Sequence, residues 1–264
     1  MDHFRLLQGS IEEILSIKCS NYKEEYIKRR IQSRMRLCGM QNFEAYHTFF
    51  ASDEKEQESL RNALTINVTK FWRDKEVFDV LQKEVLPELM KRKERIRIWS
   101  AGCATGEEPY TLALMAYDMT RLRPNVRVMI TATDIDPEAL KTARNGIYDK
   151  RSLENLSESQ IRRHFRILSD GRFEIKPHIR EMIRFQQHDL MSGQPAVKSL
   201  DIILCRNVTI YFTEKQKNAL AEIFHPALLS RGYYVLGKTE FLGREVEHLY
   251  RPFNSLQKIY LKQD

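Results

Sequence analysis

The sequence has few of the residues that build disulfide frameworks or metal centres. It contains four cysteines, which lie far apart at positions 19, 38, 103 and 205 and form no CxxC pair or zinc-ligand spacing. No apolar run approaches the ~18 residues of a membrane helix, and the N-terminus lacks the basic-then-apolar pattern of a signal peptide. We therefore expect a reduced, cytoplasmic protein with free thiols, no bound metal and no membrane insertion.

The common phosphate-binding motifs are missing as well. The sequence has no GxGxxG fingerprint, which disfavours a nicotinamide oxidoreductase, and no GK[ST] ending of a P-loop. It also lacks an (N/D)PPY-like loop and an aromatic-basic stacking platform, features that favour a nucleic-acid methyltransferase. These absences argue against a nucleic-acid partner. The net charge of +7 nevertheless suits an acidic partner or nucleic acid, so that enzyme class stays a rival interpretation.

The pattern of apolar residues changes near residue 95. Before it, segments such as YKEEYIKRRIQSRMRL carry apolar residues three and four positions apart, which predicts helices. After it, short β-rich runs such as RIRIWSA, VRVMITATD and LDIILC alternate with helical stretches, which predicts a mainly parallel sheet with helices on both faces. We expect a helical domain over 1–80 and an α/β domain over 81–264, with a small insert at about 150–182 and a last strand that returns antiparallel at the sheet edge.

The stretch RIWSAGCATGEEPY joins a strand to a helix through a glycine turn. Ligands of open α/β sheets bind beside such turns, at the carboxyl ends of the strands. Here Gly102 and Gly106 are followed at once by Glu107 and Glu108, which would repel a bound diphosphate. The turn therefore indicates a ligand that accepts negative surroundings. The alternative is that the two acids only cap the helix.

Polar residues follow other predicted strands too. Asp134 ends the next strand, where an acid can accept both hydroxyls of a ribose. Asp189 and Leu190 end another strand, where an acid beside an apolar residue can hold the amine and the face of an adenine. These features predict a ligand with a ribose and no need of a phosphate cradle. S-adenosylmethionine fits, because it joins adenosine to a positively charged sulfonium.

Five stretches, in order, resemble a known family. They are NVTKFWRD (67–74), WSAGCATGEEPY (99–110), TATDID (131–136), NGIYDKRSLENLS (145–157) and DIILCRNVTIYF (201–212). Together they are similar to the signature of CheR-type chemoreceptor glutamate O-methyltransferases, over about residues 20–262. The resemblance implies an all-α N-terminal domain and an S-adenosylmethionine-dependent, Rossmann-like methyltransferase domain with a small inserted β-subdomain. It also implies methyl transfer to glutamates on the cytoplasmic methylation helices of chemoreceptors, with S-adenosylhomocysteine as product.

The resemblance and the glycine turn also suggest roles for individual residues. The expected cofactor-binding residues are Asn67, Thr69, Arg73, Gly102, Glu108, Asp134, Asp189, Leu190, Arg206 and Asn207. We hypothesise that the Tyr211 hydroxyl orients the substrate carboxylate and that Arg73 closes the pocket and attracts the acidic side chain. The alternatives are a salt bridge from Arg73 to Asp74 or Glu76, a core or helix-cap position for Tyr211, and a cofactor-binding regulator without turnover.

The helix expected over Tyr22–Cys38 carries the most concentrated positive charge. Several of its basic residues are expected on one side, with an apolar stripe of Ile27, Ile31 and Met35 against the core. We hypothesise that a basic face docks on the acidic methylation helices, through Arg29, Arg30, Arg34 and Arg36. The alternative is a solvated basic face. Residues Glu54, Glu56 and Glu58 form a separate acidic turn.

The insert is short around Ser169-Asp170-Gly171-Arg172. Members of the family that grip a C-terminal pentapeptide of the receptor are longer and richer in glycine at this place. The resemblance therefore predicts that this protein does not need that tether.

Overall fold

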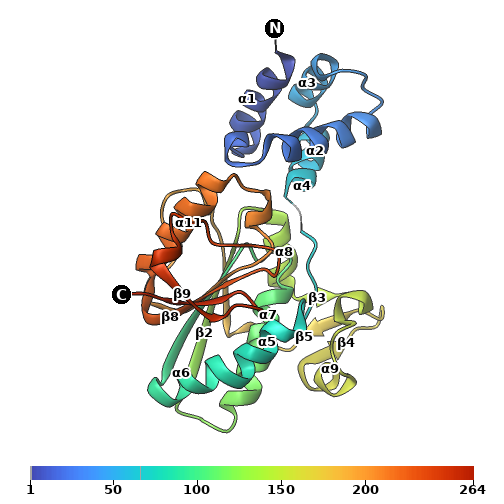
Figure 1. Cartoon of the computed structure of the whole chain (residues 1–264). Helices are drawn as coiled ribbons and strands as arrows, with labels where there is room; N and C mark the ends of the chain where they lie inside the picture. Colours follow the sequence, from blue (N-terminus) through green and yellow to red (C-terminus); the bar gives the residue numbers. More distant parts are fainter. Residues whose placement is uncertain (1, 66) are drawn as a thin grey trace. The chain divides into compact units, whose positions relative to one another are not determined.

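The computed structural model describes residues 2–65 and 67–264, which form two compact units (Figure 1). The helical unit consists of Met1–Asn67 and Tyr211–Gln216, and the sheet unit consists of Val68–Ile210 and Lys217–Asp264. The division falls between residues 67 and 68 and not at the expected residue 80. The reason is that Phe71, Val77 and Phe78 are buried in the hydrophobic core of the sheet unit.

The helical unit contains α1 (His3–Leu15), a 3-10 turn (Cys19–Asn21), α2 (Glu24–Leu37), α3 (Phe43–Ser52) and α4 (Glu54–Leu64). Three helices follow a capping residue, Asp2, Asn42 or Asp53, whose side chain accepts a backbone N–H of the first turn. On α2, Ile27 and Ile31 are fully buried in the core of this unit, as their four-residue spacing predicts.

The sheet unit begins with a continuous helical stretch made of α5 (Lys75–Val80), a π-helical segment (Leu81–Val85) and α6 (Leu86–Arg92). The main sheet consists of β1 (Arg95–Ala101), β2 (Arg127–Asp134), β6 (Ile183–Gln187), β7 (Leu200–Cys205), β8 (Leu228–Leu236), β9 (Tyr250–Asn254) and β10 (Ile259–Lys262). Its connecting helices are α7 (Glu107–Thr120), α8 (Pro137–Asn145) and α11 (Glu214–Ala227). Within the described ranges, no helix is both long and apolar enough to cross a bilayer.

The strands lie in the order β6-β2-β1-β7-β8-β10-β9, and the first five run parallel. Alternate residues of a strand face opposite sides of the sheet. Ile98 of β1 therefore packs in one core with residues of α5, α6 and α7. Its neighbour Trp99 packs edge-on against Phe224 of α11, with ring centroids 5.1 Å apart. Helices cover both faces, which confirms the predicted α/β class (Figure 1).

The prediction for the last strand is wrong in one respect. β10 runs antiparallel to β8, but β9 lies outside it and forms the edge of the sheet. The sequence of β9, YRPFN, has a proline and too few apolar residues to read as a strand. Pro252 is tolerated there because an edge strand has one side that makes no ladder hydrogen bonds.

A small antiparallel sheet is inserted between α8 and β6. Its strands are β3 (Ile147–Tyr148), β4 (Phe165–Ile167) and β5 (Phe173–Ile175), in the order β3-β5-β4, with α9 (Glu158–His164) and α10 (Pro177–Arg180) beside them. β4 and β5 form a hairpin around Gly171, which has φ 82°. Phe71 packs edge-on against Tyr148 and Phe165 of this sheet, at 5.1 and 5.5 Å between centroids.

Candidate functional site

Four neighbouring strands, β6, β2, β1 and β7, end at the same edge of the main sheet. In their register Asp134 pairs with Gln187, and Ala101 pairs with Thr133. The segments that follow these strands therefore come together, and they contain Asp189, Asp134, Gly102 and Arg206. Residues as far apart in the sequence as Gly102 and Arg206 thus come to one edge of the sheet.

The glycine turn closes over the end of β2. The N–H groups of Gly102 and Cys103 donate to the Thr133 carbonyl at 2.8 and 2.9 Å. Gly102 has φ +79°, and a Cβ atom there would lie 2.5 Å from Cγ2 of Val208. Only glycine allows this combination of backbone conformation and close approach.

The two acids after the turn have different surroundings. Glu107 is buried, which raises the pKa of its carboxyl, and it accepts a hydrogen bond from the Thr105 hydroxyl at 2.7 Å. Glu108 accepts from the Ser100 hydroxyl at 2.8 Å and from Arg206 at 3.0 Å. Glu108 therefore faces the strand ends and does more than cap α7.

The two predicted acids on the neighbouring strand ends are held by backbone N–H groups. Asp134 accepts from Ala104 at 2.8 Å and from Asp136 at 3.0 Å, and burial raises the pKa of its carboxyl. Asp189 accepts from the N–H of Met191 at 2.8 Å, and Leu190 beside it is buried. Both carboxyl groups are thus fixed in place at the sheet edge.

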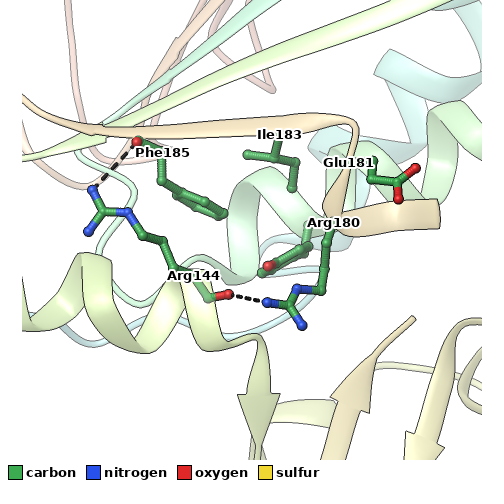
Figure 2. A pocket seen from close by; sticks show the side chains of 6 residues that line it. Arg144, Arg180, Glu181, Ile183 and Phe185 are labelled. Atoms are coloured by element: carbon green, nitrogen blue, oxygen red, sulfur yellow. Dashed lines mark hydrogen bonds between the residues drawn. The ribbon is translucent and has the colours of Figure 1, made fainter. Parts of the chain in front are cut away.

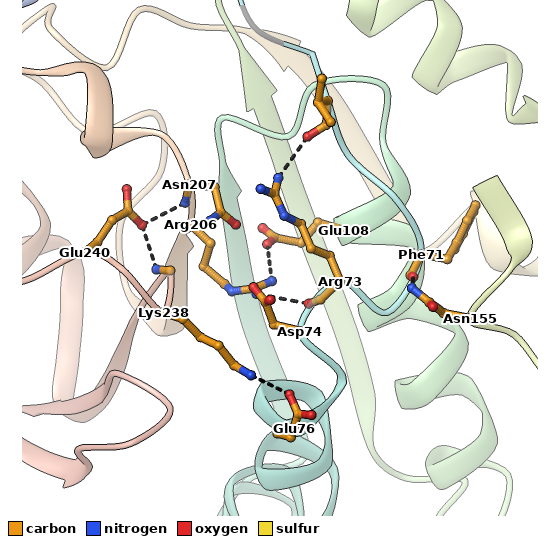
Figure 3. Close-up of polar contacts among 12 residues, drawn as sticks. Phe71, Arg73, Asp74, Glu76, Glu108, Asn155, Arg206, Asn207, Lys238 and Glu240 are labelled. Atoms are coloured by element: carbon orange, nitrogen blue, oxygen red, sulfur yellow. Dashed lines mark hydrogen bonds and ion pairs between the residues drawn. The ribbon is translucent and has the colours of Figure 1, made fainter. Parts of the chain in front are cut away.

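Arg206 joins three segments of the sheet unit (Figure 3). Its side chain is only 1% exposed and forms ion pairs with Asp74 at 2.7 Å and Glu108 at 3.0 Å. It also donates to the Arg73 carbonyl at 3.0 Å and lies over the Phe78 ring. Its Nε has no hydrogen-bond partner among the described residues. The guanidinium therefore ties the segment before α5 to α7 and to the end of β7.

Arg73 lies in the same group of polar side chains. Its guanidinium donates to the Val68 carbonyl at 2.8 Å. The two acids considered as alternative partners are bound to other cations, Asp74 to Arg206 and Glu76 to Lys238 at 2.6 Å. The structure therefore does not pair Arg73 with either acid, and the Arg73 side chain is half-buried at the surface of the site.

Backbone strain is concentrated around these residues. Four non-glycine residues of the site region have positive φ: Trp72 at 51°, Asp74 at 58°, Ala104 at 47° and Asn207 at 61°. Such conformations cost free energy and persist only where the surroundings enforce them, and they cluster at functional sites. The three loops that carry them are the loops that meet at the sheet edge.

The remaining predicted residues divide between the two units. Thr69 lies half-buried in the sheet unit, and Asn67 belongs to the helical unit. Tyr211 is also counted with the helical unit, because its ring packs on Tyr26 at 4.8 Å between centroids and its carbonyl accepts from the N–H of Lys23 at 3.0 Å. Tyr211 is half-buried.

The four arginines expected to dock a substrate differ in their contacts. Arg29 and Arg36 are exposed on α2, and Arg30 lies over the Tyr26 ring at 5.5 Å. Arg34 is different, because it is paired with the buried carboxylate of Glu56 at 2.5 Å. Burial alone would raise the pKa of Glu56, but hydrogen bonds from Arg34, Tyr46 and Cys38 outweigh it and lower the pKa. The acidic turn thus supplies the internal partner of Arg34.

Three side chains that shape the site were not expected from the sequence. Asp74 and Ser100 lie inside recognisable motifs, and their polar side chains next to strand or helix ends were the available signal. Glu240 follows the strand GYYVLG and is 2% exposed. It accepts the N–H of Asn207 at 2.7 Å. Nothing local in the sequence indicates that contact.

A separate pocket of about 380 Å³ lies beside the edge strand β6 (Figure 2). It is lined by Tyr110, Arg144, Arg180, Glu181, Ile183 and Phe185. Arg180 donates to the Arg144 carbonyl at 2.9 Å. None of these six residues belongs to the predicted site, so this pocket is distinct from the strand ends described above.

The sequence matches two family descriptions that together span almost the whole chain. Residues 67–258 match "CheR methyltransferase, SAM binding domain", and residues 2–65 match "CheR methyltransferase, all-alpha domain". The chain belongs to the CheR methyltransferase family. It is an S-adenosylmethionine-dependent methyltransferase, and the two matched regions correspond to the sheet unit and the helical unit.

Relatives of this CheR-family chain include three chemotaxis protein methyltransferases. The one from Borreliella burgdorferi is 36% identical over 233 residues, which cover 85% of this chain and 82% of the relative. Chemotaxis protein methyltransferase 2 of Vibrio cholerae is 34% identical over 230 residues, covering 85% and 80%. Chemotaxis protein methyltransferase 1 of Pseudomonas aeruginosa is 32% identical over 252 residues, covering 93% and 92%.

The residues at the strand ends fit S-adenosylmethionine by charge and by hydrogen bonding. The site has more carboxyl groups than guanidiniums, which are Asp74, Glu108, Asp134 and Asp189 against Arg73 and Arg206, so negative charge is in excess. S-adenosylmethionine has two positive groups and one carboxylate, so it carries the opposite net charge. The buried Nε of Arg206 is a donor that no described residue satisfies.

Proposed function

We propose that this CheR-family protein methylates glutamate side chains on the cytoplasmic methylation helices of chemoreceptors, forming glutamate methyl esters in adaptation. The observation that carries the proposal is the group of fixed carboxylates at the ends of β2 and β6 and at the start of α7, in a chain of this family. The names of the relatives support the link to chemotaxis. A cytoplasmic location follows from such a substrate.

Within this proposal the cofactor is held by the sheet-edge residues and their neighbours. Asp134 and Glu108 would face the ribose and adenosine, and Asp189 with Leu190 would hold the adenine. The other proposed cofactor contacts come from Asn67, Thr69, Arg73, Gly102, Arg206 and Asn207. When bound, S-adenosylmethionine supplies an activated methyl group, and S-adenosylhomocysteine is the product. The chemistry needs no metal.

The protein would act by binding, orienting and drying its reactants. A glutamate side chain is already ionised at neutral pH, so it needs no general base. The Tyr211 hydroxyl would donate to the substrate carboxylate and orient it, and the Arg73 guanidinium would attract that carboxylate. Holding the reacting groups in line can lower a barrier by about 7–11 kcal/mol. Removal of water from the carboxylate adds to its reactivity.

Substrate recognition would rest on the exposed arginines of α2. Arg29 and Arg36 have free surface, and Arg30 extends the positive charge, which suits an acidic helical substrate. Arg34 belongs to the proposed set by charge, although its guanidinium is paired with Glu56. The hairpin between β4 and β5 is short, and we propose that this protein needs no pentapeptide tether on the receptor.

The test is incubation with S-adenosylmethionine labelled in its methyl group and membranes that carry chemoreceptors. We expect label on the receptor that mild base releases, because a carboxyl methyl ester is base-labile. Receptors with and without the C-terminal pentapeptide should be labelled alike. Label on RNA instead of receptor would support the rival nucleic-acid enzyme, and base-stable label would contradict ester formation.

The roles of Arg73 and Tyr211 are tested in the same assay. Tyr211→Phe should lower turnover and leave the affinity for S-adenosylmethionine unchanged, because only the hydroxyl is lost. Arg73→Ala should lower both. Tyr233→Phe serves as control, since that hydroxyl contacts Glu88 in the sheet unit at 3.2 Å. Wild-type turnover in both test variants would contradict these roles.

A further inference from the structure

The turn after β8 carries a buried carboxylate that binds the loop after β7 (Figure 3). Glu240 is 2% exposed. One of its oxygens accepts the N–H of Asn207 and the N–H of Gly237, each at 2.7 Å. The other accepts the Thr209 hydroxyl at 2.8 Å and the N–H of Ile210 at 3.2 Å. Four donors thus converge on a single side chain.

Burial of the Glu240 carboxylate costs free energy unless hydrogen bonds replace the water that it loses. A carboxylate that leaves water must be compensated by charged partners or by several hydrogen bonds. Glu240 obtains that compensation from two backbone N–H groups and a hydroxyl of one loop, together with the N–H of Gly237. Hydrogen bonds to an ionised acceptor are also stronger than neutral ones. The carboxylate therefore binds Asn207, Thr209 and Ile210 as a group.

The backbone of Asn207 explains why such a hold is needed. Asn207 has φ 61°, in the left-handed region that few residues other than glycine adopt without cost. A strained residue keeps its conformation only when its surroundings enforce it. Its N–H is fixed by Glu240, and Arg206 before it is fixed by Asp74 and Glu108. Carboxylates thus hold both residues, Asn207 by its N–H and Arg206 by its guanidinium.

Gly237 also belongs to the group of residues around the Glu240 carboxylate. A Cβ atom at this position would lie 2.5 Å from Oε2 of Glu240 and 2.9 Å from the nitrogen of Asn207. The absence of a side chain therefore lets the carboxylate and the loop approach closely. Register places this contact directly beyond the sheet, because Cys205 pairs with Leu236.

We propose that Glu240 is a positioning residue for cofactor binding, which sets the place of Asn207 and of the chain that leads to Tyr211. The inference rests on the proposed role of Asn207 at the cofactor. Glu240 itself touches neither cofactor nor substrate in this scheme. Its carboxylate acts by holding the strained loop in the conformation that presents Asn207.

The experiment compares Glu240→Gln with a matched buried acid. Asp201 is 1% exposed and accepts the Arg97 N–H at 2.9 Å and a hydrogen bond from Lys93. It is the second residue of β7, so it lies near the end of that strand opposite to Asn207. Asp201→Asn and Glu240→Gln should both lower thermal stability. Only Glu240→Gln should weaken S-adenosylmethionine binding, measured by calorimetry, by about tenfold, equal to about 1.4 kcal/mol.

A second variant keeps the test decisive if Glu240→Gln folds poorly. Gly237→Ala leaves the carboxylate in the chain but displaces it, and it should weaken binding in the same way. Hydrogen exchange of the Asn207 and Ile210 amides, measured without ligand, should quicken in both variants and not in Asp201→Asn. Affinity within twofold of wild type in both variants would overturn the proposal, as would an equal loss in Asp201→Asn. These readouts need no receptor, so failure to methylate a receptor would count only against the proposed function.

Discussion

Replacement of Arg206 by methionine should destabilise the sheet unit more than any loss of a surface charge. Methionine keeps much of the side-chain volume but removes the positive charge between Asp74 and Glu108, whose side chains are 27% and 14% exposed. Removal of one partner from a buried ion pair costs about 3–5 kcal/mol. Because Asp74 can regain some water, we expect a value near the lower end, about 3 kcal/mol.

The two tryptophans provide a specific assay for this effect. Trp72 and Trp99 both belong to the sheet unit, and both are buried. Tryptophan fluorescence during urea unfolding therefore reports on that unit alone, which avoids treating a protein of two units as a single transition. Arg231→Met is the control, because Arg231 is 62% exposed and lies 3.5 Å from Glu88. We expect it to cost about 0–1 kcal/mol.

A double-mutant cycle separates the ion pair from other losses. If Glu108→Gln is introduced first, Arg206→Met should cost less, since fewer unpaired charges remain. We expect a coupling free energy of about 1–3 kcal/mol, within the usual range for groups in contact. If the unfolding free energies of Arg206→Met and Arg231→Met differed by less than about 1 kcal/mol, the view that the Arg206 guanidinium joins the three segments would be refuted.

Other parts of the molecule give further expectations. Gly102→Ala should destabilise the sheet unit by about 1–3 kcal/mol in urea unfolding. Val208→Ala in the same chain should recover part of that stability, because it removes the side-chain atom that the new Cβ would meet. No recovery would contradict the steric explanation. Burial lowers the pKa of His164 in the folded protein below its usual 6.5, so the neutral imidazole contributes stability that is present above pH 6.5 and declines as the pH falls toward the folded-state pKa. Between pH 7.5 and pH 5.5, His164→Gln should therefore lose less of its free energy of unfolding than the wild type. An equal loss of unfolding free energy in both proteins would exclude His164 as the cause. Arg29→Glu with Arg36→Glu should reduce receptor methylation about tenfold at low salt, with calorimetric affinity for S-adenosylmethionine unchanged, and full activity at low salt would contradict docking by α2.

The sheet, and the gathering of acids at one edge of it, could be predicted because both depend on local patterns. A buried parallel strand reads as a continuous apolar run, as at residues 202–205 (IILC), and a glycine turn follows β1 directly. The carboxyl ends of parallel strands meet at one edge, so acids after successive strands could be placed near one another without coordinates. Asp134, Asp189 and Gly102 follow this rule.

The pairing of distant charges could not be predicted in the same way. Asp74 and Arg206 are 132 residues apart, and no periodicity links them. The position of Arg34 on α2 does not distinguish it from the other arginines of that helix. Its pairing with Glu56 arises only when the helical unit folds. The edge strand β9 was not predicted for a different reason. A strand with solvent on one side needs few apolar residues, so its sequence gives little signal.

The helical unit is completed by a stretch encoded far from the rest of it. Gln216 donates to the Asn21 side chain at 2.9 Å, Phe212 packs on Tyr22 at 5.2 Å between centroids, and the N–H of Thr213 reaches the Asn21 carbonyl. A gene fragment that stops at residue 67 would leave these groups of Asn21 and Tyr22 without their neighbours. Exchange of the helical unit between homologous proteins should therefore succeed only when both of its sequence segments, Met1–Asn67 and Tyr211–Gln216, are exchanged together. Recombination at a single crossover point would separate the two segments.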